Sequence, residues 1–179
     1  MSDLAVHHSS KTAEHYTPAA VLDLVLEVMG GIDLDPCADP GCRVPAMIHY
    51  TAEIGGLRQP WAGRVYMNPP YGREIGSWVD RLVDQYQAGK VEEAIALVPA
   101  RVDTLWFKRL TAHGGPVLFW RGRLAFVGND GPAPFPSALV YMGPRRSKFS
   151  GAASRYGDVW RMIMPEGERP QVLGGAGVI

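Results

Sequence analysis

Residues 68 to 71 read Asn-Pro-Pro-Tyr, a combination that can hold an exocyclic amine. Such an amine, on adenine, cytosine or an amide, is a poor nucleophile because its lone pair is delocalised into the attached π-system. A protein can help by accepting hydrogen bonds from both amine hydrogens. Asn68 offers a side-chain carbonyl for this purpose, and Pro69 offers a backbone carbonyl while its own nitrogen cannot donate.

The second proline and the tyrosine complete this acceptor clamp. Pro70 holds the residue before it in an extended conformation, so the acceptors are fixed before a substrate arrives and their electrostatic effect is preorganised. Tyr71 offers a flat face on which a planar ring can stack, and a duplex base reaches such a pocket only by leaving the helix. The alternative is a rigid turn with an exposed tyrosine, for which one proline would be enough.

An amine needs an electrophile as its reaction partner, and acidic residues upstream suit one kind. Neither GxGxxG nor GxxxxGK[ST] occurs, so cofactors held through phosphates find no support. Asp35 ends a predicted strand, and Glu53 follows about 18 residues later, close to the ~20-residue offset at which a carboxylate binds ribose. A sulfonium donor with an ammonium group and a ribose would suit both acids. The alternatives are that Asp35 caps its own turn and that Glu53 is an exposed loop residue.

Three stretches carry apolar residues at helical spacing between residues that favour helix ends. These helices are expected from a Thr17-Pro18 cap to Gly30-Gly31, over 75–86 before Gly89, and from an Asp103 cap to Gly114-Gly115.

Apolar runs bounded by turn residues predict the strands, and the first of them breaks at Pro36. Because strands and helices alternate through the first 120 residues, we predict an α/β fold with a mostly parallel sheet, helices on both faces and antiparallel closing strands. Ligands of such sheets bind at the carboxyl ends of the strands, where the Asn-Pro-Pro-Tyr segment falls. The predicted strands are 32–35, 46–51, 63–67, 93–100, 116–120, 123–127, 137–142 and 158–164.

Length and composition indicate one soluble domain. We expect it over 15–164, between a polar arm at 1–14 and a Gly- and Pro-rich tail at 165–179. No apolar run approaches the ~18 residues of a membrane span, and the first residues lack a signal-peptide core, so a cytoplasmic protein is expected. The formal net charge is +0, so nucleic-acid binding would require a local basic patch.

The two cysteines, Cys37 and Cys42, could suggest a metal site together with His49. A structural zinc site usually has four protein ligands, and no fourth is evident nearby. We therefore predict two reduced thiols and no metal.

A series of segments resembles the phage-type DNA N-6-adenine methyltransferases, the small Dam-like family. Their order and spacing cover about 130 residues, which is more specific than the Asn-Pro-Pro-Tyr motif that rRNA, tRNA and protein-glutamine methyltransferases also carry. The segments are YTPAAV at 16–21, IDLDPCA at 32–38, GLRQPW at 56–61, VYMNPPYG at 65–72, LVPARVDTLWF at 97–107, GRLAF at 122–126 and PAPFPSALVYM at 132–142.

The resemblance implies a Rossmann-like methyltransferase fold that uses S-adenosylmethionine and acts on double-stranded DNA in a bacterial host cell. Asn68, Pro69, Pro70 and Tyr71 would then clamp the target base. Two features differ from the expected pattern: DPCADPG replaces a glycine-rich cofactor loop, and Gly55 stands where the family has an acid. The resemblance implies that Tyr16, Thr17, Pro18, Asp35, Pro36, Cys37 and Asn68 lie around the cofactor, and Glu53 is added from its spacing.

The chain has no room for a large target-recognition domain, so loops must contact the DNA. Segment 143–161 combines basic and aromatic residues that could hold phosphates and stack bases, and the alternative is a solvated basic loop. Arg101 sits at a predicted strand end, where it could face DNA or the cofactor. The basic residues of the segment assigned to DNA are Arg145, Arg146, Lys148 and Arg155.

The leading hypothesis is therefore an enzyme that methylates adenine in DNA by direct in-line transfer. Such a transfer needs no covalent intermediate. One alternative keeps the chemistry but changes the substrate to RNA or a protein glutamine. The other is a non-catalytic relic that only binds DNA or the cofactor.

Overall fold

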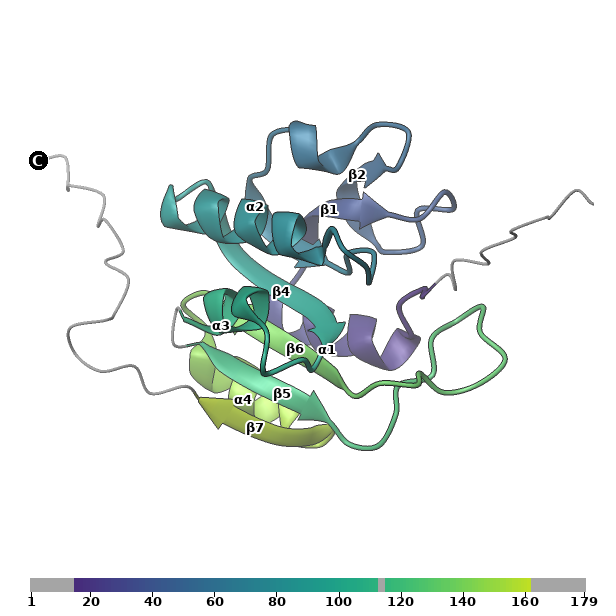
Figure 1. Cartoon of the computed structure of the whole chain (residues 1–179). Helices are drawn as coiled ribbons and strands as arrows, with labels where there is room; N and C mark the ends of the chain where they lie inside the picture. The colour runs from purple at the N-terminus through teal and green to yellow at the C-terminus, as the bar shows by residue number, and fades with distance from the viewer. Residues whose placement is uncertain (1–14, 113–114, 162–179) are drawn as a thin grey trace, which may run out of the picture.

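One mixed sheet of seven strands carries the fold, in the order β2-β1-β3-β4-β6-β5-β7 (Figure 1). The computed structural model describes residues 15–112 and 115–161. The strands are β1 (Ile32–Ala38), β2 (Ala46–Thr51), β3 (Gly63–Met67), β4 (Val91–Pro99), β5 (Pro116–Trp120), β6 (Ser137–Met142) and β7 (Gly157–Arg161). The helices are α1 (Ala19–Met29), α2 (Ile75–Gln87), α3 (Leu105–Thr111) and α4 (Arg146–Ala153), with a 3-10 turn η1 (Gly56–Arg58).

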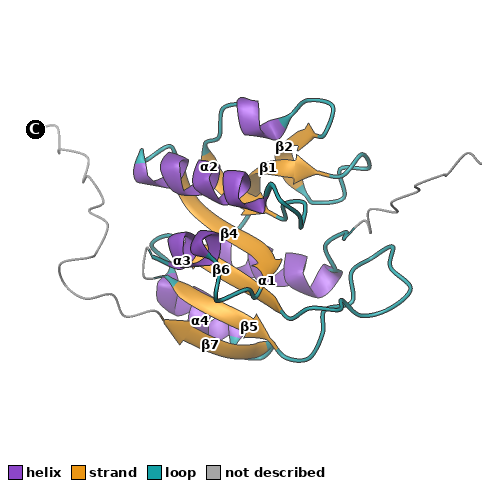
Figure 2. Cartoon of the chain, in the orientation of Figure 1, coloured by secondary structure: helices purple, strands orange, loops and turns teal. Residues whose placement is uncertain are grey.

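The strand directions define two edges of the sheet. β1 to β4 are mutually parallel, while β6 runs antiparallel to both β4 and β5, so β5 points the same way as β4. Figure 2 shows the arrowheads of β4 and β5 on one side and that of β7 on the other. We call the side where β1 to β5 end the carboxyl edge. The opposite side, where Met142 of β6 pairs with Ala94 of β4, is the amino edge.

Helices cover both faces of the sheet, which confirms the predicted α/β class with antiparallel closing strands. α1 and α4 contribute to the core on one face, and α2 and α3 to the core on the other. β4 is buried along its length except at Glu92, as expected for a central strand. Within the described ranges, no helix has the length and apolar character that crossing a membrane requires. The helical spacing predicted for α2 is confirmed, because that helix buries Ile75, Trp78, Val79, Leu82 and Val83.

The prediction that the first strand breaks at Pro36 is wrong. β1 continues to Ala38, and its pairing with β2 is irregular between Asp35 and Ala38. Proline lacks a backbone donor, so it is tolerated where such an irregularity removes the need for one. Asp35 therefore lies inside a strand, on a backbone that the neighbouring strand holds in place.

Two predicted helix caps are also wrong. α1 begins at Ala19, and the Thr17 side chain makes no capping hydrogen bond to it. α3 is capped by Thr104 rather than Asp103, because the Thr104 hydroxyl accepts a hydrogen bond from the Phe107 N–H. Thr17 is consequently available for other contacts, which are described below.

Two further segments differ from their predicted conformations. Residues 123–127 form no strand: apart from an isolated bridge between Val127 and Tyr16, they follow a loop. Segment 143–161 is no loop, because it forms α4 and β7. The remainder of the strand predicted at 158–164, the arm at 1–14 and the tail at 165–179 lie outside the described residues.

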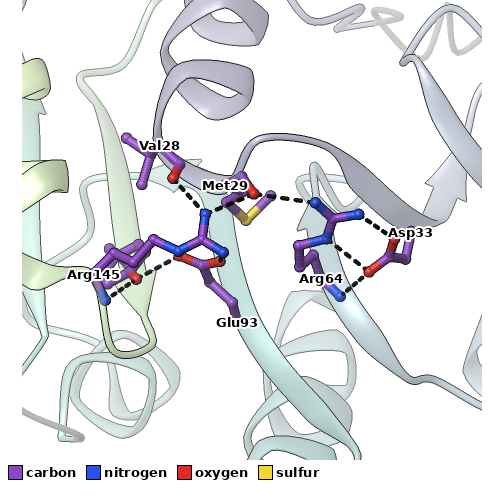
Figure 3. A network of polar contacts seen from close by, with 7 residues as sticks. Val28, Met29, Asp33, Arg64, Glu93 and Arg145 are labelled. Atoms are coloured by element: carbon purple, nitrogen blue, oxygen red, sulfur yellow. Dashed lines mark hydrogen bonds and ion pairs between the residues drawn. The ribbon is translucent and has the colours of Figure 1, made fainter.

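A buried carboxylate at the amino edge explains why this segment is ordered (Figure 3). Glu93 is 2% exposed and accepts a hydrogen bond of 2.6 Å from the Tyr141 hydroxyl. The Arg145 guanidinium lies 3.5 Å from the Glu93 carboxylate and donates to the carbonyls of Val28 and Met29 at 2.9 and 2.8 Å. The start of α4 is thus fastened to β4 and to the last turn of α1.

A second arginine supports the same end of α1. Arg64 of β3 donates to the Met29 carbonyl at 3.2 Å and pairs with Asp33 at 2.6 Å, as Figure 3 shows. The last carbonyls of a helix carry partial negative charge, so two guanidinium groups there are stabilising. Hydrogen bonding to Arg64 also lowers the pKa of Asp33.

Replacing Arg145 with methionine should destabilise the protein. The buried Glu93 carboxylate would keep Tyr141 as a partner but lose its cation, and breaking a buried ion pair typically costs ~3–5 kcal/mol. Because the Arg145 side chain is 41% exposed, solvent screening reduces the expected loss of unfolding free energy to about 2 kcal/mol. Urea denaturation measures the loss, with Lys148→Met on the exposed side of α4 as the control. Equal stability of the two variants would contradict this account.

Candidate active site

A cavity of about 720 Å³ opens at the carboxyl edge, beside the ends of β1 and β3. β1 pairs with β2 on one side and with β3 on the other, so the strand order reverses here. This is the position at which open α/β sheets bind ligands, and the volume is within the range of small-molecule sites. The cavity is lined by segments 15–17, 35–40, 50–52, 55–58 and 68–72, together with Leu22, Arg43, Val44, Glu74 and Trp78.

The Asn68 side chain is held from both ends of its amide. Its Nδ2 donates to the His15 carbonyl at 2.8 Å and to the Thr17 hydroxyl oxygen at 3.2 Å. Its Oδ1 accepts a hydrogen bond of 2.8 Å from the Tyr71 hydroxyl. The amide nitrogen therefore faces the N-terminal segment, while the amide oxygen faces the motif and is presented as an acceptor.

Tyr71 lies within an aromatic cluster. Its ring centroid is 5.2 Å from that of His15, 5.9 Å from Phe126 and 5.4 Å from Phe135. Burial raises the pKa of Tyr71 well above its usual value, so the hydroxyl is a donor at neutral pH. Burial lowers the pKa of His15, which favours its neutral ring. The tyrosine ring therefore already packs against other rings in the free protein, and its stacking on a base stays a prediction.

His15, Phe126 and Phe135 were not identified from the sequence as site residues. His15 lies just after the predicted arm, and the two phenylalanines lie in a segment read as a strand and a turn. A usable signal was present, because both phenylalanines sit within the segments shared with the methyltransferase family. Within the motif itself, Pro69 is buried and Pro70 is exposed.

Asp35 faces the cavity from β1. It is 3% exposed, and its Oδ1 accepts a hydrogen bond of 3.1 Å from the Cys37 N–H. Burial is the main cause that raises the pKa of Asp35 to about 6. A carboxylate with little compensation in a cavity is suited to a cationic ligand. The bond to Cys37 supports the interpretation of Asp35 as a turn carboxylate, and its role as a cofactor ligand stays a prediction.

The other predicted cofactor residues divide into two groups. Glu53 is exposed and does not line the cavity. Asp39 lines it instead, accepting from the Gly41 N–H at 2.8 Å and pairing with Arg43, whose guanidinium lies 4.0 Å from the centre of the Tyr16 ring. Tyr16, Thr17, Asp35, Pro36, Cys37 and Asn68 all line the cavity, whereas Pro18 does not.

The basic residues predicted to bind DNA do not gather around the cavity. Arg101 is exposed and follows β4 at the carboxyl edge. Arg145 lies at the amino edge in the network described above, and Arg155 pairs with Glu27 of α1. The cavity is lined by none of Arg101, Arg145, Arg146, Lys148 and Arg155.

The described residues contain no group of three His, Cys, Asp or Glu side chains that could hold a metal ion. Cys37 and Cys42 are free thiols. His49, the residue considered with them, has its Nε2 2.7 Å from the Val44 carbonyl.

Replacing Asp35 with asparagine should stabilise the protein at neutral pH. The pKa of Asp35 is about 6 in the fold, so the unfolded chain, with a pKa near ~3.9, releases the proton more readily. The stability that Asp35 contributes is fully present below its pKa in the unfolded chain and is lost as the pH rises through about 6. The difference between the two pKa values corresponds to ~3 kcal/mol of unfolding free energy. The variant should therefore gain most at pH 8 and nothing at pH 4, as urea denaturation at each pH would show.

Asp33→Asn is the matched control for this prediction. Because hydrogen bonding to Arg64 lowers the pKa of Asp33, its removal should destabilise the protein at neutral pH, the opposite sign. A loss of stability in Asp35→Asn at pH 8 would contradict the interpretation of Asp35 as an under-compensated buried carboxylate.

One comparison with known proteins bears on this site. The family model described as DNA N-6-adenine-methyltransferase (Dam) matches residues 7–136. The matched range contains all the segments that line the cavity and ends just before β6. No curated protein matches the chain.

Proposed function

Because the chain belongs to the DNA N-6-adenine-methyltransferase (Dam) family, we propose that it transfers a methyl group from S-adenosylmethionine to N6 of an adenine flipped out of double-stranded DNA. The scaffold would be of the Rossmann-like methyltransferase type, and the setting the cytoplasm of a bacterial host cell. The observation that carries the proposal is the Asn68 amide. Its nitrogen is fixed by His15 and Thr17, so its oxygen is directed as an acceptor at the end of β3.

The cavity fits the proposed cofactor in size and in charge. S-adenosylmethionine supplies a methyl group that its sulfonium activates. Asp35 would balance that positive charge, and Tyr16, Pro36 and Cys37 would form the surrounding wall. Glu53 would reach the ribose only if the loop after β2 moved. Asp39 already lines the cavity, so it is the better placed acid for binding the ribose.

The clamp would act on the target amine through acceptors alone. The Asn68 side-chain oxygen and the Pro69 carbonyl would each accept one amine hydrogen, which keeps the nitrogen lone pair directed towards the methyl group. The Asn68 oxygen accepts one hydrogen bond from the Tyr71 hydroxyl, and its second lone pair would accept from the target amine. For the Tyr71 ring to stack on the base, its contacts with His15, Phe126 and Phe135 would have to open.

We assign the DNA backbone to the carboxyl edge, where exposed arginines follow β3, β4 and β5. These are Arg73, Arg101, Arg121 and Arg123. Within the described part of the chain, none of the four forms an ion pair, whereas the arginines in ion pairs are Arg43, Arg64, Arg109, Arg145 and Arg155. Uncompensated guanidinium groups along the carboxyl edge would give a near-neutral protein the local patch that a polyanion requires.

The activity itself is tested by incubation with methyl-labelled S-adenosylmethionine and, separately, DNA, RNA and protein acceptors. Label in N6-methyladenine of DNA is the expected result. Label confined to RNA or to protein glutamine would favour the other methyltransferase substrates, and DNA binding without any transfer would indicate a relic.

Asn68→Ala should lower turnover by ~100- to 1000-fold, the usual cost of losing one preorganised electrostatic contact. Affinity for S-adenosylmethionine should change much less, because the amide oxygen faces the motif. Single-turnover kinetics and calorimetric titration measure the two effects. Near-normal turnover in a folded variant would refute the role of the clamp.

Changing Arg101, Arg121 and Arg123 together to glutamine should weaken binding to every DNA sequence. Each lost phosphate contact should also reduce the slope of log affinity against log salt by about 0.9. Lys148→Gln, alone and with Arg146→Gln, is the matched comparison, because the sequence assigned DNA binding to that segment. Filter binding across a salt series distinguishes the carboxyl edge from α4 as the DNA-binding surface. Weaker binding only in the Lys148 and Arg146 variants would assign the DNA to α4.

A further inference from the structure

We propose that the Tyr66 hydroxyl, acting through Thr17, is a positioning group that fixes the direction in which the Asn68 amide faces. The inference rests on the proposed function, since it concerns the amide that would bind the target amine. Tyr66 lies on β3, two residues before Asn68, and it does not line the cavity. It would therefore act on the reaction without touching either substrate.

The contacts form a short chain from the core to the clamp. The Thr17 hydroxyl oxygen lies 2.9 Å from the Tyr66 hydroxyl oxygen and 3.2 Å from Asn68 Nδ2. Tyr66 is 0% exposed, and burial raises the pKa of its hydroxyl, so the phenol keeps its hydrogen. A buried hydroxyl must use that hydrogen or lose stabilising free energy.

Either direction of this bond leaves a lone pair on the Thr17 oxygen for Asn68 Nδ2, because a hydroxyl oxygen has two lone pairs. Donation by Tyr66 also satisfies the buried phenol hydrogen. The Tyr66–Thr17 bond therefore holds the Thr17 oxygen in place as an acceptor for the Asn68 amide.

Two acceptors then select one orientation of an amide whose ends are nearly equal in shape. Rotating the Asn68 amide by half a turn would place its oxygen against the His15 carbonyl, 2.8 Å away, and against the Thr17 oxygen. It would also direct the amide nitrogen at Tyr71, which would leave no acceptor for a target amine. Two groups thus select the orientation of the Asn68 amide: the Thr17 hydroxyl, held by Tyr66, and the backbone carbonyl of His15.

Packing alone does not require the hydroxyl of Tyr66. The ring lies in the core on the α1 face of the sheet, where phenylalanine would fill nearly the same volume. Tyr141 is a useful comparison, because it is equally buried and uses its hydroxyl at the amino edge, on Glu93.

The test is Tyr66→Phe, with Tyr141→Phe as the matched control. Without the hydrogen bond to Tyr66, the Thr17 side chain is no longer held with its oxygen towards Asn68 Nδ2, so the amide loses one of the two acceptors that select its orientation. We expect turnover to fall by ~3- to 10-fold, on the scale of one neutral hydrogen bond, with little change in KM for DNA or cofactor. Tyr141→Phe should lower stability but leave turnover unchanged.

Thr17→Val and Thr17→Ser separate the hydroxyl from the shape of the side chain. Valine should lower turnover at least as much as Tyr66→Phe, because it removes the acceptor itself, and the double variant should lose little more than Thr17→Val. Serine should restore most of the activity. Full activity in Tyr66→Phe, or additive losses in the double variant, would overturn the inference.

A second readout needs no substrate, so it stands even if the proposed methylation fails. The side-chain NH₂ signals of Asn68, assigned by their absence in Asn68→Ala, should be dispersed and slow to exchange in the free protein. They should shift and exchange faster in Tyr66→Phe, and remain unchanged in Tyr141→Phe. Signals unchanged in Tyr66→Phe would show that the hydroxyl has only a packing role.

Discussion

The fold depends on supplying partners for the buried carboxylate of Glu93. A charge that is 2% exposed requires partners, and Tyr141 and Arg145 supply them from β6 and the start of α4. Arg145 also donates hydrogen bonds to the last carbonyls of α1, so the network joins β4, α1 and the start of α4 at the amino edge. The carboxyl edge can then carry long loops, because the network at the amino edge already fixes the sheet and helices from which these loops extend.

Apart from the Arg43–Asp39 ion pair in the cavity wall, the polar groups at the two edges of the sheet differ in how they are compensated. At the amino edge, Arg64 and Arg145 have carboxylates and helix carbonyls as partners. At the carboxyl edge, Asp35 is buried with its pKa raised, and arginines such as Arg101 have no ion-pair partner in the described ranges. Local departures from the best stability are expected where a protein binds ligands. The contrast supports the cavity as the functional site without reference to any family.

The sequence predicted what depends on local pattern. The apolar spacing of α2 and the unbroken apolar run of β4 were sufficient to place those elements, and the parallel order placed Asn68 beside β1. Contacts between distant segments could not be predicted in this way: Thr17 has the residue type of a helix cap, but Tyr66 and Asn68, about fifty positions away, use its hydroxyl. Arg145 likewise reads as a basic surface residue, because nothing in its neighbours shows that two helix carbonyls lie within reach.

The hydrogen bond from Tyr71 to Asn68 has a consequence for base discrimination. The Asn68 oxygen accepts one hydrogen bond in the free protein, and an amide oxygen has a second lone pair. Under the proposed function, the amine of adenine would use that second position while Tyr71 keeps the first. Thymine carries a carbonyl oxygen in place of an exocyclic amine, so two acceptors would face each other without a hydrogen between them, at a cost of about 1–3 kcal/mol. The pocket would therefore reject thymine because this base lacks the donor that the Asn68 oxygen requires.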